Sequence, residues 1–175
     1  MRQLPSTIAA LLVFAAAPAL AGKLTITMNA IDATGTGAVI GTIEAKDTKQ
    51  GLALTPKLSG LPAGPHGIHV HQNGDCSPKE QDGKPVAGLA AGGHFAPHAA
   101  GKHAGPWQDG GHQGDLPALA VKGDGTASET LVAPHLKTAD LKGRAIIIHA
   151  GADNYSDTPK PLGGGGARIA CGVVK

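Results

Sequence analysis

Short apolar stretches with a period of two residues constrain this chain more than any other feature. Leu24, Ile26 and Met28 alternate with polar residues, and comparable stretches recur between segments rich in glycine and proline. Side chains two residues apart lie on the same face of a strand, so this alternation predicts half-buried strands. No stretch carries an apolar helical stripe of useful length. The sequence therefore predicts an all-β fold.

The expected strands are separated by turns in the manner of an antiparallel fold. A Gly-Asp-Gly turn at residues 123–125 separates two of them, and Pro56 is expected to interrupt another. The strands are expected at residues 24–28, 39–43, 52–58, 67–72, 116–122, 126–132, 145–149 and 168–174. This pattern predicts one domain, an eight-stranded antiparallel Greek-key β-barrel or sandwich of immunoglobulin-like architecture.

Two long segments show no sustained period. Residues 73–115 hold many Gly, Pro and Asp, and residues 153–166 hold two prolines and a run of four glycines. Irregular segments of this length are uncommon in compact domains and usually carry function. We therefore expect two long functional loops.

Residues 1–21 have the features of a cleavable signal peptide. Arg2 supplies a positive charge, residues 8–17 are apolar, and residues 19–21 form an A-x-A cleavage pattern. The apolar run is shorter than the roughly 20 residues that span a bilayer. A buried N-terminal helix is the alternative interpretation. We expect a mature domain at residues 22–175, without membrane insertion.

The charge and aromatic content argue against a nucleic-acid binder. The full chain carries 15 Lys and Arg against 13 Asp and Glu, and removal of Arg2 with the signal peptide leaves a balance of about +1. Aromatic residues make up 2% of the chain, so it offers no stacking platform for bases. We expect no nucleic-acid partner.

The two cysteines, Cys76 and Cys171, are expected to pair. An exported chain meets an oxidising compartment, where an even number of cysteines predicts a disulfide. The bond would close a loop of about 95 residues. Two free buried thiols, or a pair of zinc ligands, are the alternatives.

Histidines supply the strongest chemical signal. His69 and His71 lie two residues apart on an expected strand, so their rings face the same way, about 7 Å apart, while Val70 faces the core. His149 ends another expected strand and could complete a site with them. A site made mostly of imidazoles, with room for a further ligand, suits copper and redox chemistry.

A second group of possible ligands lies in the first long loop. Three imidazoles and one carboxylate complete a tetrahedral zinc shell with no open position, which is typical of structural zinc. The members of this group are His94, His103, His112 and Asp115. The remaining histidines, His66, His98 and His135, are expected to have roles other than metal binding.

These residues resemble a copper,zinc superoxide dismutase of the bacterial periplasmic type. The resemblance covers nearly all of residues 23–175, and several independent motifs in one order make it specific. The motifs are GIHVH at 67–71, GDC at 74–76, AAGGHF at 90–95, GKH at 101–103, GHQGDLP at 111–117, IHAG at 148–151 and GGARIACG at 165–172.

The resemblance implies a division of the ligands between two metals. The implied copper ligands are His69, His71, His94 and His149, and the implied zinc ligands are His94, His103, His112 and Asp115. His94 would bridge both metals as an imidazolate. Asp153 matches the carboxylate that links a copper histidine to a zinc histidine, and Arg168 matches the cation beside the open copper position. The pair Cys76–Cys171 matches the family disulfide.

The implied activity is the dismutation of superoxide to oxygen and hydrogen peroxide. One copper ion per subunit would be reduced and oxidised in turn, and one zinc ion would be structural. His94 would take up and return a proton, and Arg168 would attract and orient the anion. The implied location is the periplasm, and a homodimer is one arrangement that the resemblance allows.

Three other functions are alternatives to this activity. A non-catalytic periplasmic copper and zinc carrier, similar to a metallochaperone, would be favoured by loss of a copper ligand or of Arg168, and all are present. A zinc hydrolase needs an open zinc position and a general base. A secreted β-sandwich adhesion domain leaves the histidines unexplained.

Overall fold

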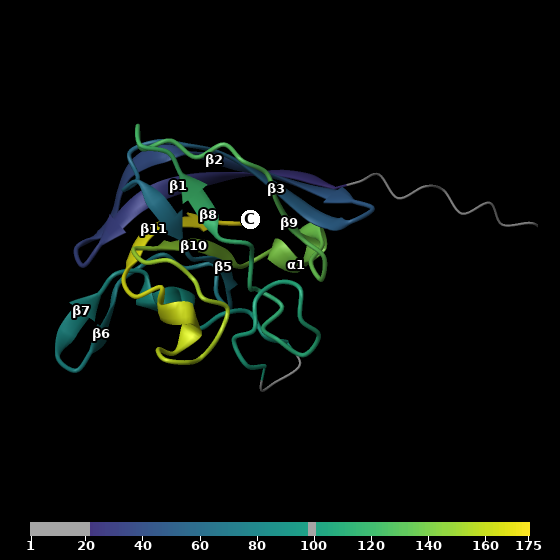
Figure 1. The fold of residues 1–175 in the computed structure, drawn as a ribbon. Helices are drawn as coiled ribbons and strands as arrows, with labels where there is room; N and C mark the ends of the chain where they lie inside the picture. Colours follow the sequence, from purple (N-terminus) through teal and green to yellow (C-terminus); the bar gives the residue numbers. More distant parts are fainter. Residues whose placement is uncertain (1–21, 98–100) are drawn as a thin grey trace, which may run out of the picture.

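The computed structural model describes residues 22–97 and 101–175, so the expected signal peptide and His98 lie outside the described residues. The strands, shown in Figure 1, are β1 (Lys23–Asp32), β2 (Gly35–Thr48), β3 (Gly51–Leu58), β4 (Gly64–His66), β5 (Ile68–His71), β6 (Lys79–Gln81), β7 (Lys84–Val86), β8 (Leu119–Val121), β9 (Leu131–Ala133), β10 (Ala145–His149) and β11 (Arg168–Val173). The short helices are η1 (Leu89–Ala91), α1 (Thr138–Leu141) and η2 (Leu162–Gly164). None of these helices is long and apolar enough to cross a membrane.

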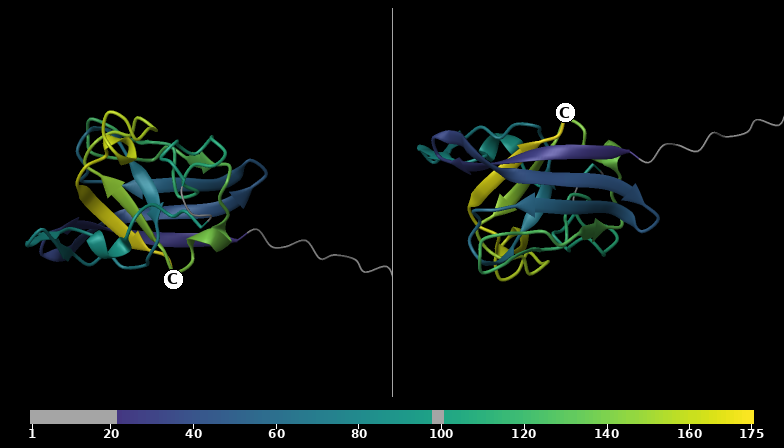
Figure 2. Two further views of the ribbon diagram at one scale, coloured as in Figure 1. Left: turned by 90° about the horizontal axis from the view of Figure 1, so that it is seen from below. Right: turned by 90° about the horizontal axis from the view of Figure 1, so that it is seen from above.

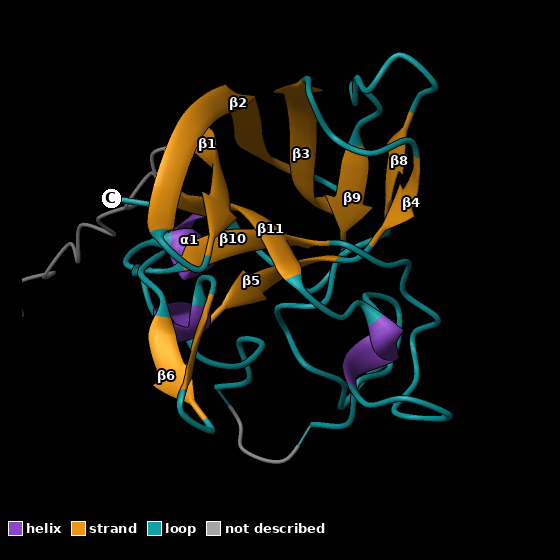
Figure 3. Cartoon of the chain, turned by 90° about the vertical axis from the view of Figure 1, so that its left-hand side faces the viewer, coloured by secondary structure: helices purple, strands orange, loops and turns teal. Residues whose placement is uncertain are grey.

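Seven strands form one antiparallel sheet in the order β5-β10-β11-β1-β2-β3-β9. The sheet curls into a half-barrel, with β1, β2, β3 and β9 on one side and β5, β10 and β11 on the other (Figure 3). A separate pair, β4 and β8, stands beside β9. The predicted all-β fold is confirmed.

The main hydrophobic core fills the inside of the curl. In β1, Ile26 and Met28 are buried in it and the intervening Thr27 is exposed, as the period of two predicts. Strand β10 is buried on both faces, because Ile146 and Ile148 enter the main core while Ile147 packs on the other side. This second side of β10 is where the loops cover the sheet.

Strand β3 continues through Pro56, contrary to the expected interruption. Pro56 pairs with Ile43 of β2, while on its other side β3 meets β9 only at residues 52–54. The missing N–H of Pro56 therefore leaves no gap in a ladder with β9.

The first long loop contains a hairpin that the sequence analysis did not place. Strands β6 and β7 are joined by Asp82 and Gly83, which have φ values of 53° and 73°. Two positive φ values suit the mirror-image turns that join antiparallel strands, and Asp-Gly is a typical sequence for them.

The strands expected at 116–122 and 126–132 are shorter in the structure than the sequence predicts. Only β8 and β9 take part in ladder pairing there.

The predicted disulfide between Cys76 and Cys171 is present. Cys171 lies in β11, and its bond fastens the start of the first long loop to the central part of the sheet. The bond joins residues 95 positions apart, for which the chain-entropy model gives a stabilisation of about 4–5 kcal/mol.

Candidate metal centre

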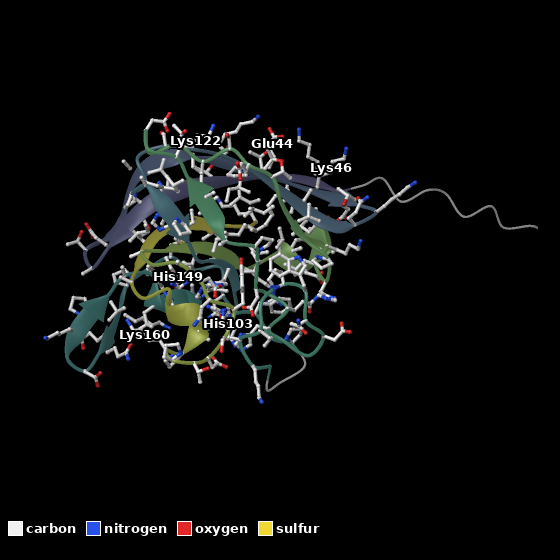
Figure 4. The ribbon with its side chains drawn as sticks, viewed as in Figure 1. Glu44, Lys46, His103, Lys122, His149 and Lys160 are labelled. Atoms are coloured by element: carbon white, nitrogen blue, oxygen red, sulfur yellow. A yellow bond between two sulfur atoms is a disulfide. The ribbon has the colours of Figure 1, made fainter. Side chains whose placement is uncertain are left out.

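Three of the predicted copper histidines, His69, His71 and His149, lie on strands of the curled sheet. His69 of β5 is opposite Ile147 of β10, and Val70 is fully buried in the main core on the other face, as expected. The two long loops cover the outer face (Figure 2), so His69 is buried as well. In Figure 4, His103 and His149 lie on the side of the molecule opposite to Glu44, Lys46 and Lys122.

A closed ring of three backbone hydrogen bonds joins the segments that carry the ligands. Val70 N–H donates to the carbonyl of Gly114, Gly114 N–H to Phe95, and Phe95 N–H to Val70, each over 2.8 Å. A Cβ atom at Gly114 would collide with the carbonyl oxygen of Val70, so the ring requires glycine there. The chain neighbours of these residues are the predicted ligands His69, His71, His94 and Asp115.

Hydrogen bonds to the backbone orient two of the imidazoles that are predicted to bind copper. His71 Nδ1–H donates to the carbonyl of Gly92 over 2.9 Å, and His149 Nδ1–H donates to Gly166 over 3.2 Å. Each bond fixes the tautomer, so the Nε2 lone pair is free. His69 is held by the other nitrogen, because its Nε2 bonds to a carboxylate, and its Nδ1 is free.

These nitrogens converge. The four histidines predicted to hold copper form one group whose ligand atoms all lie within 4.8 Å of one another. Its members are His69, His71, His94 and His149.

The zinc-side residues gather around Asp115. Its Oδ1 lies 2.9 Å from His94 Nδ1, and its Oδ2 lies 2.9 Å from His103 Nδ1. These three residues and His69 form the second group within 4.8 Å. His112 stands at the edge of this group, with its Nδ1 3.6 Å from Asp115 Oδ1.

Six buried imidazole nitrogens make no hydrogen bond of good geometry among the described residues, although one of them, His103 Nδ1, lies 2.9 Å from Asp115 Oδ2. They are His69 Nδ1, His71 Nε2, His94 Nε2, His103 Nδ1, His112 Nδ1 and His149 Nε2. Burying an unpaired polar atom is costly, so six of them in one place indicate that other partners belong there. Imidazole and carboxylate donors suit copper and zinc, so the residues present fit both metals.

Asp153 contacts a histidine of each group. Its Oδ2 accepts a hydrogen bond from His69 Nε2, and its Oδ1 accepts one from His103 Nε2, each over 2.7 Å. Asp157, which the sequence analysis did not identify, accepts a bond from the backbone N–H of His103 over 3.0 Å. Its position in an irregular loop gave no periodic signal that could have singled it out.

Arg168 lies opposite His149 in the pairing of β10 with β11. Its half-buried guanidinium donates to the carbonyls of Gly88 and Gly92. Gly92 therefore accepts hydrogen bonds from both Arg168 and the copper-side His71. These carbonyls are backbone atoms of the first long loop, so no side-chain pattern could have predicted them.

The other two described histidines lie outside both groups. His66 is buried between two backbone carbonyls, those of Pro62 and His149, at 2.8 and 2.7 Å from its ring nitrogens. His135 is 43% exposed and lies 3.8 Å from Asp109. Neither has a ring nitrogen among the buried unpaired atoms.

Burial and carboxylates divide the histidines into two electrostatic classes. Burial lowers the pKa of His94 to about 4 and that of His149 to about 3, although Asp115 opposes the shift at His94. Burial also lowers the pKa of His103, but Asp115 and Asp153 outweigh it and raise this pKa to about 9. Without metal at pH 7, His103 is therefore protonated, while His94 and His149 are neutral.

Comparison with known proteins gives one consistent result. The family model for copper/zinc superoxide dismutase matches residues 39–174. The chain is 53% identical over 157 residues to the superoxide dismutase [Cu-Zn] of Photobacterium leiognathi, which covers 90% of this chain and 89% of that protein. It is 51% identical over 176 residues to superoxide dismutase [Cu-Zn] 2 of Salmonella typhimurium, with full coverage of both chains.

A solved structure agrees with these sequence matches. The Cu/Zn superoxide dismutase from Brucella abortus superposes with a TM-score of 0.86 at 49% sequence identity. The match covers 88% of this chain and 100% of the Brucella chain.

Replacement of Gly163 by alanine should weaken zinc binding. Gly163 has a φ of 72°, and a Cβ atom there would meet the Asp153 carboxylate and would lie 2.7 Å from His103 Nε2. The collision would separate the two side chains. Loss of a partner that orients a metal ligand typically lowers metal affinity 10- to 100-fold. We expect the zinc dissociation constant of G163A, measured by competition with a chromophoric chelator, to rise by at least about tenfold.

Gly164→Ala is the matched control. Gly164 has a similar φ of 77°, but the nearest atom to an added Cβ is Lys160 Cβ at 3.6 Å. Both variants carry backbone strain of about 1–2 kcal/mol, and only G163A has the collision. Equal zinc dissociation constants in the two variants would contradict this explanation.

Zinc binding to the metal-free protein should release a proton at neutral pH. A raised pKa at His103 stabilises the metal-free fold below the unfolded value near 6.5, and this stabilisation is lost as pH rises through about 9. A zinc ion that binds His103 Nδ1 must displace the proton, so zinc affinity should rise with pH up to about 9. Calorimetry in buffers of different ionisation enthalpy would count the proton.

Asp153→Asn serves as the control for this proton count. It removes one of the two carboxylates that raise the pKa of His103, so the pH at which zinc affinity levels off should fall. Zinc binding to the unmodified protein at pH 7.5 without proton release would show that His103 is already neutral.

Proposed function

Since the chain belongs to the copper/zinc superoxide dismutase family, we propose that its two ligand groups hold copper and zinc, with His94 shared between them. The resemblance supports His69 as a copper ligand, and its Nδ1 is available for a metal because Asp153 occupies its other nitrogen. With His69 proposed for copper, we propose His112 as the remaining zinc ligand, because its Nδ1 is buried and has no hydrogen-bond partner among the described residues. The proposed copper ligands are His69, His71, His94 and His149, and the proposed zinc ligands are His94, His103, His112 and Asp115.

The chain is a superoxide dismutase, an oxidoreductase whose substrate is superoxide. Copper, when bound, supplies a one-electron couple that takes an electron from one superoxide and gives it to the next. Two superoxide ions and two protons yield one oxygen and one hydrogen peroxide. The convergence of the unpaired nitrogens on two adjacent positions is the observation that supports the proposed metal sites.

His94 is suited to hold a proton during this cycle. Its Nδ1 faces Asp115 on the zinc side, while its Nε2 belongs to the copper-side group and has no protein partner. A proton can therefore occupy Nε2 and leave again without breaking a hydrogen bond within the protein.

Arg168 is proposed to attract and orient the superoxide anion. Its guanidinium is held by the carbonyls of Gly88 and Gly92, next to the strand position of His149. A fixed cation there adds a local field that steers anions, and this attraction weakens as salt screens it.

The function as a non-catalytic copper and zinc carrier is not favoured. Relatives at 51–53% identity are named superoxide dismutases, and Arg168 stands beside a complete set of ligand side chains. A zinc hydrolase would need a zinc position open to water, whereas four side chains are available to fill the zinc shell here.

Metal analysis and an activity assay on one preparation test the function. We expect the purified protein to bind one copper and one zinc ion per chain and to dismutate superoxide. Arg168→Ala should lower kcat/KM by roughly 10-fold or more and flatten its dependence on ionic strength, since the steering cation is lost. Stopped-flow decay of superoxide at several salt concentrations measures both effects.

Arg168→Lys separates charge from geometry in this assay. Lysine keeps the charge but cannot donate to both carbonyls as a planar fork, so the salt dependence should persist at an intermediate rate. Full metal loading without dismutation would disprove the enzymatic function. An unchanged rate in R168A would remove the role assigned to the arginine.

We propose further that residues 1–21 are a signal peptide and that the mature domain, residues 22–175, works in the periplasm. The charged start, the apolar run and the A-x-A pattern support this proposal. The intact mass of the protein recovered from the periplasm should correspond to a chain that starts at Gly22. A full-length chain retained in the cytoplasm would contradict the proposal.

A homodimer is a further prediction. Light scattering on the same preparation would measure the mass of the assembly and so test it.

A further inference from the structure

Arg144 has an extended set of contacts at the start of β10. Its backbone N–H donates to the carbonyl of Leu141 at the end of α1, and its Nε donates to the carbonyl of Asp140 over 2.8 Å. The base of the side chain is therefore fixed to α1. Its guanidinium extends beyond the helix, toward the segments that carry the metal ligands.

The guanidinium meets two of these segments. Its Nη1 donates to the carbonyl of Gln72 over 2.9 Å, and its central carbon lies 3.5 Å from the centre of the Phe95 ring. Gln72 directly follows His71, and Phe95 directly follows His94. One side chain thus touches the residue after a proposed copper ligand and the residue after the proposed bridging ligand.

The same two segments are bonded to each other between these contacts. His71 and His94 face each other in an isolated antiparallel bridge, and the N–H of Gln72 donates to the carbonyl of Gly93 over 3.0 Å. The peptide groups on both sides of Gln72 are therefore held, one by the first long loop and one by Arg144. The ring of Phe95 is buried, and the guanidinium covers one of its faces.

We propose that Arg144 is a positioning residue for the metal centre, which holds the His94–Phe95 segment in register with the end of β5. The proposal rests on the metal ligands assigned above. The hydrogen bonds of the Arg144 guanidinium and its contact with an aromatic ring reach Phe95 and Gln72 rather than a ligand ring, so it acts through these two residues. Its effect is on the spacing between the His71 and His94 imidazoles, which determines the copper geometry.

The arrangement needs arginine rather than any cation. A planar guanidinium can lie flat on an aromatic ring while its edge donates hydrogen bonds in two directions. A lysine ammonium is a point charge on a flexible chain and cannot do both. Arg144→Lys therefore keeps the positive charge but removes the planar group that contacts Phe95 and Gln72. Phe95→Leu removes the aromatic ring and keeps an apolar side chain.

The test compares R144K, F95L and the R144K/F95L double variant, each loaded with copper and zinc. Because loss of a residue that orients a ligand costs 10- to 100-fold in metal affinity, we expect the copper dissociation constant to rise about tenfold in each single variant. The copper spin-resonance spectrum should change as well. Because Arg144 contacts Gln72 as well as Phe95, the double variant should resemble R144K rather than the product of the two single variants.

Lys142→Gln is the control, because it removes an exposed positive charge two residues away from Arg144. It should leave both the copper affinity and the spectrum unchanged. A native spectrum and copper affinity in R144K, even with a lower melting temperature, would reduce Arg144 to a stabilising residue and overturn the proposal. Independent, multiplying effects of R144K and F95L on affinity would also overturn it, because they exclude action through Phe95.

Failure of the underlying metal assignment has a different signature. In that case the unmodified protein itself would not bind one copper and one zinc ion. A normally loaded unmodified protein with an unaffected R144K variant would disprove only the role of Arg144.

Discussion

The ring of hydrogen bonds among Val70, Phe95 and Gly114 is the constraint on which the centre depends. These residues come from β5 and from two distant parts of the first long loop, and each both donates to and accepts from another member. A shift of any one breaks two buried backbone bonds, which is costly when no water can replace them. The adjacent ligand side chains are therefore held together by the chain itself. The absence of a Cβ atom at Gly114 makes this close approach possible.

The fold could be predicted where the pattern of apolar residues is local. Alternation in β1 and the apolar run of β10 predicted strands correctly, because both follow from which faces are buried. Prediction failed where the outcome depends on a pairing partner. Pro56 remains within β3 because β9 does not extend beside it, and no local pattern states how far a neighbouring strand reaches. The β6–β7 hairpin was missed although its Asp-Gly turn was visible, because apolar alternation does not mark its short exposed strands.

The side chains of the centre were easier to identify than the atoms that orient them. Histidine and aspartate are common metal ligands, so residue type alone indicates them. The ligand atoms of His69, His71, His94 and His149 do lie close together. The carbonyls of Gly92 and Gly166, which select the tautomers, carry no side-chain signal. Asp157 and Arg144 resemble ordinary surface charges in the sequence. Their contacts with His103 and Phe95 exist only because the two loops and α1 meet in the folded chain.

The shared carbonyl of Gly92 has a mechanical consequence. It accepts from His71 Nδ1 over 2.9 Å and from the Arg168 guanidinium over 2.7 Å, so one peptide group links both side chains. A displacement of this part of the loop moves the imidazole and the cation in the same direction. The shared carbonyl therefore constrains the distance between the His71 imidazole and the Arg168 guanidinium. Thermal motion can change the position of this unit while largely preserving its internal dimensions.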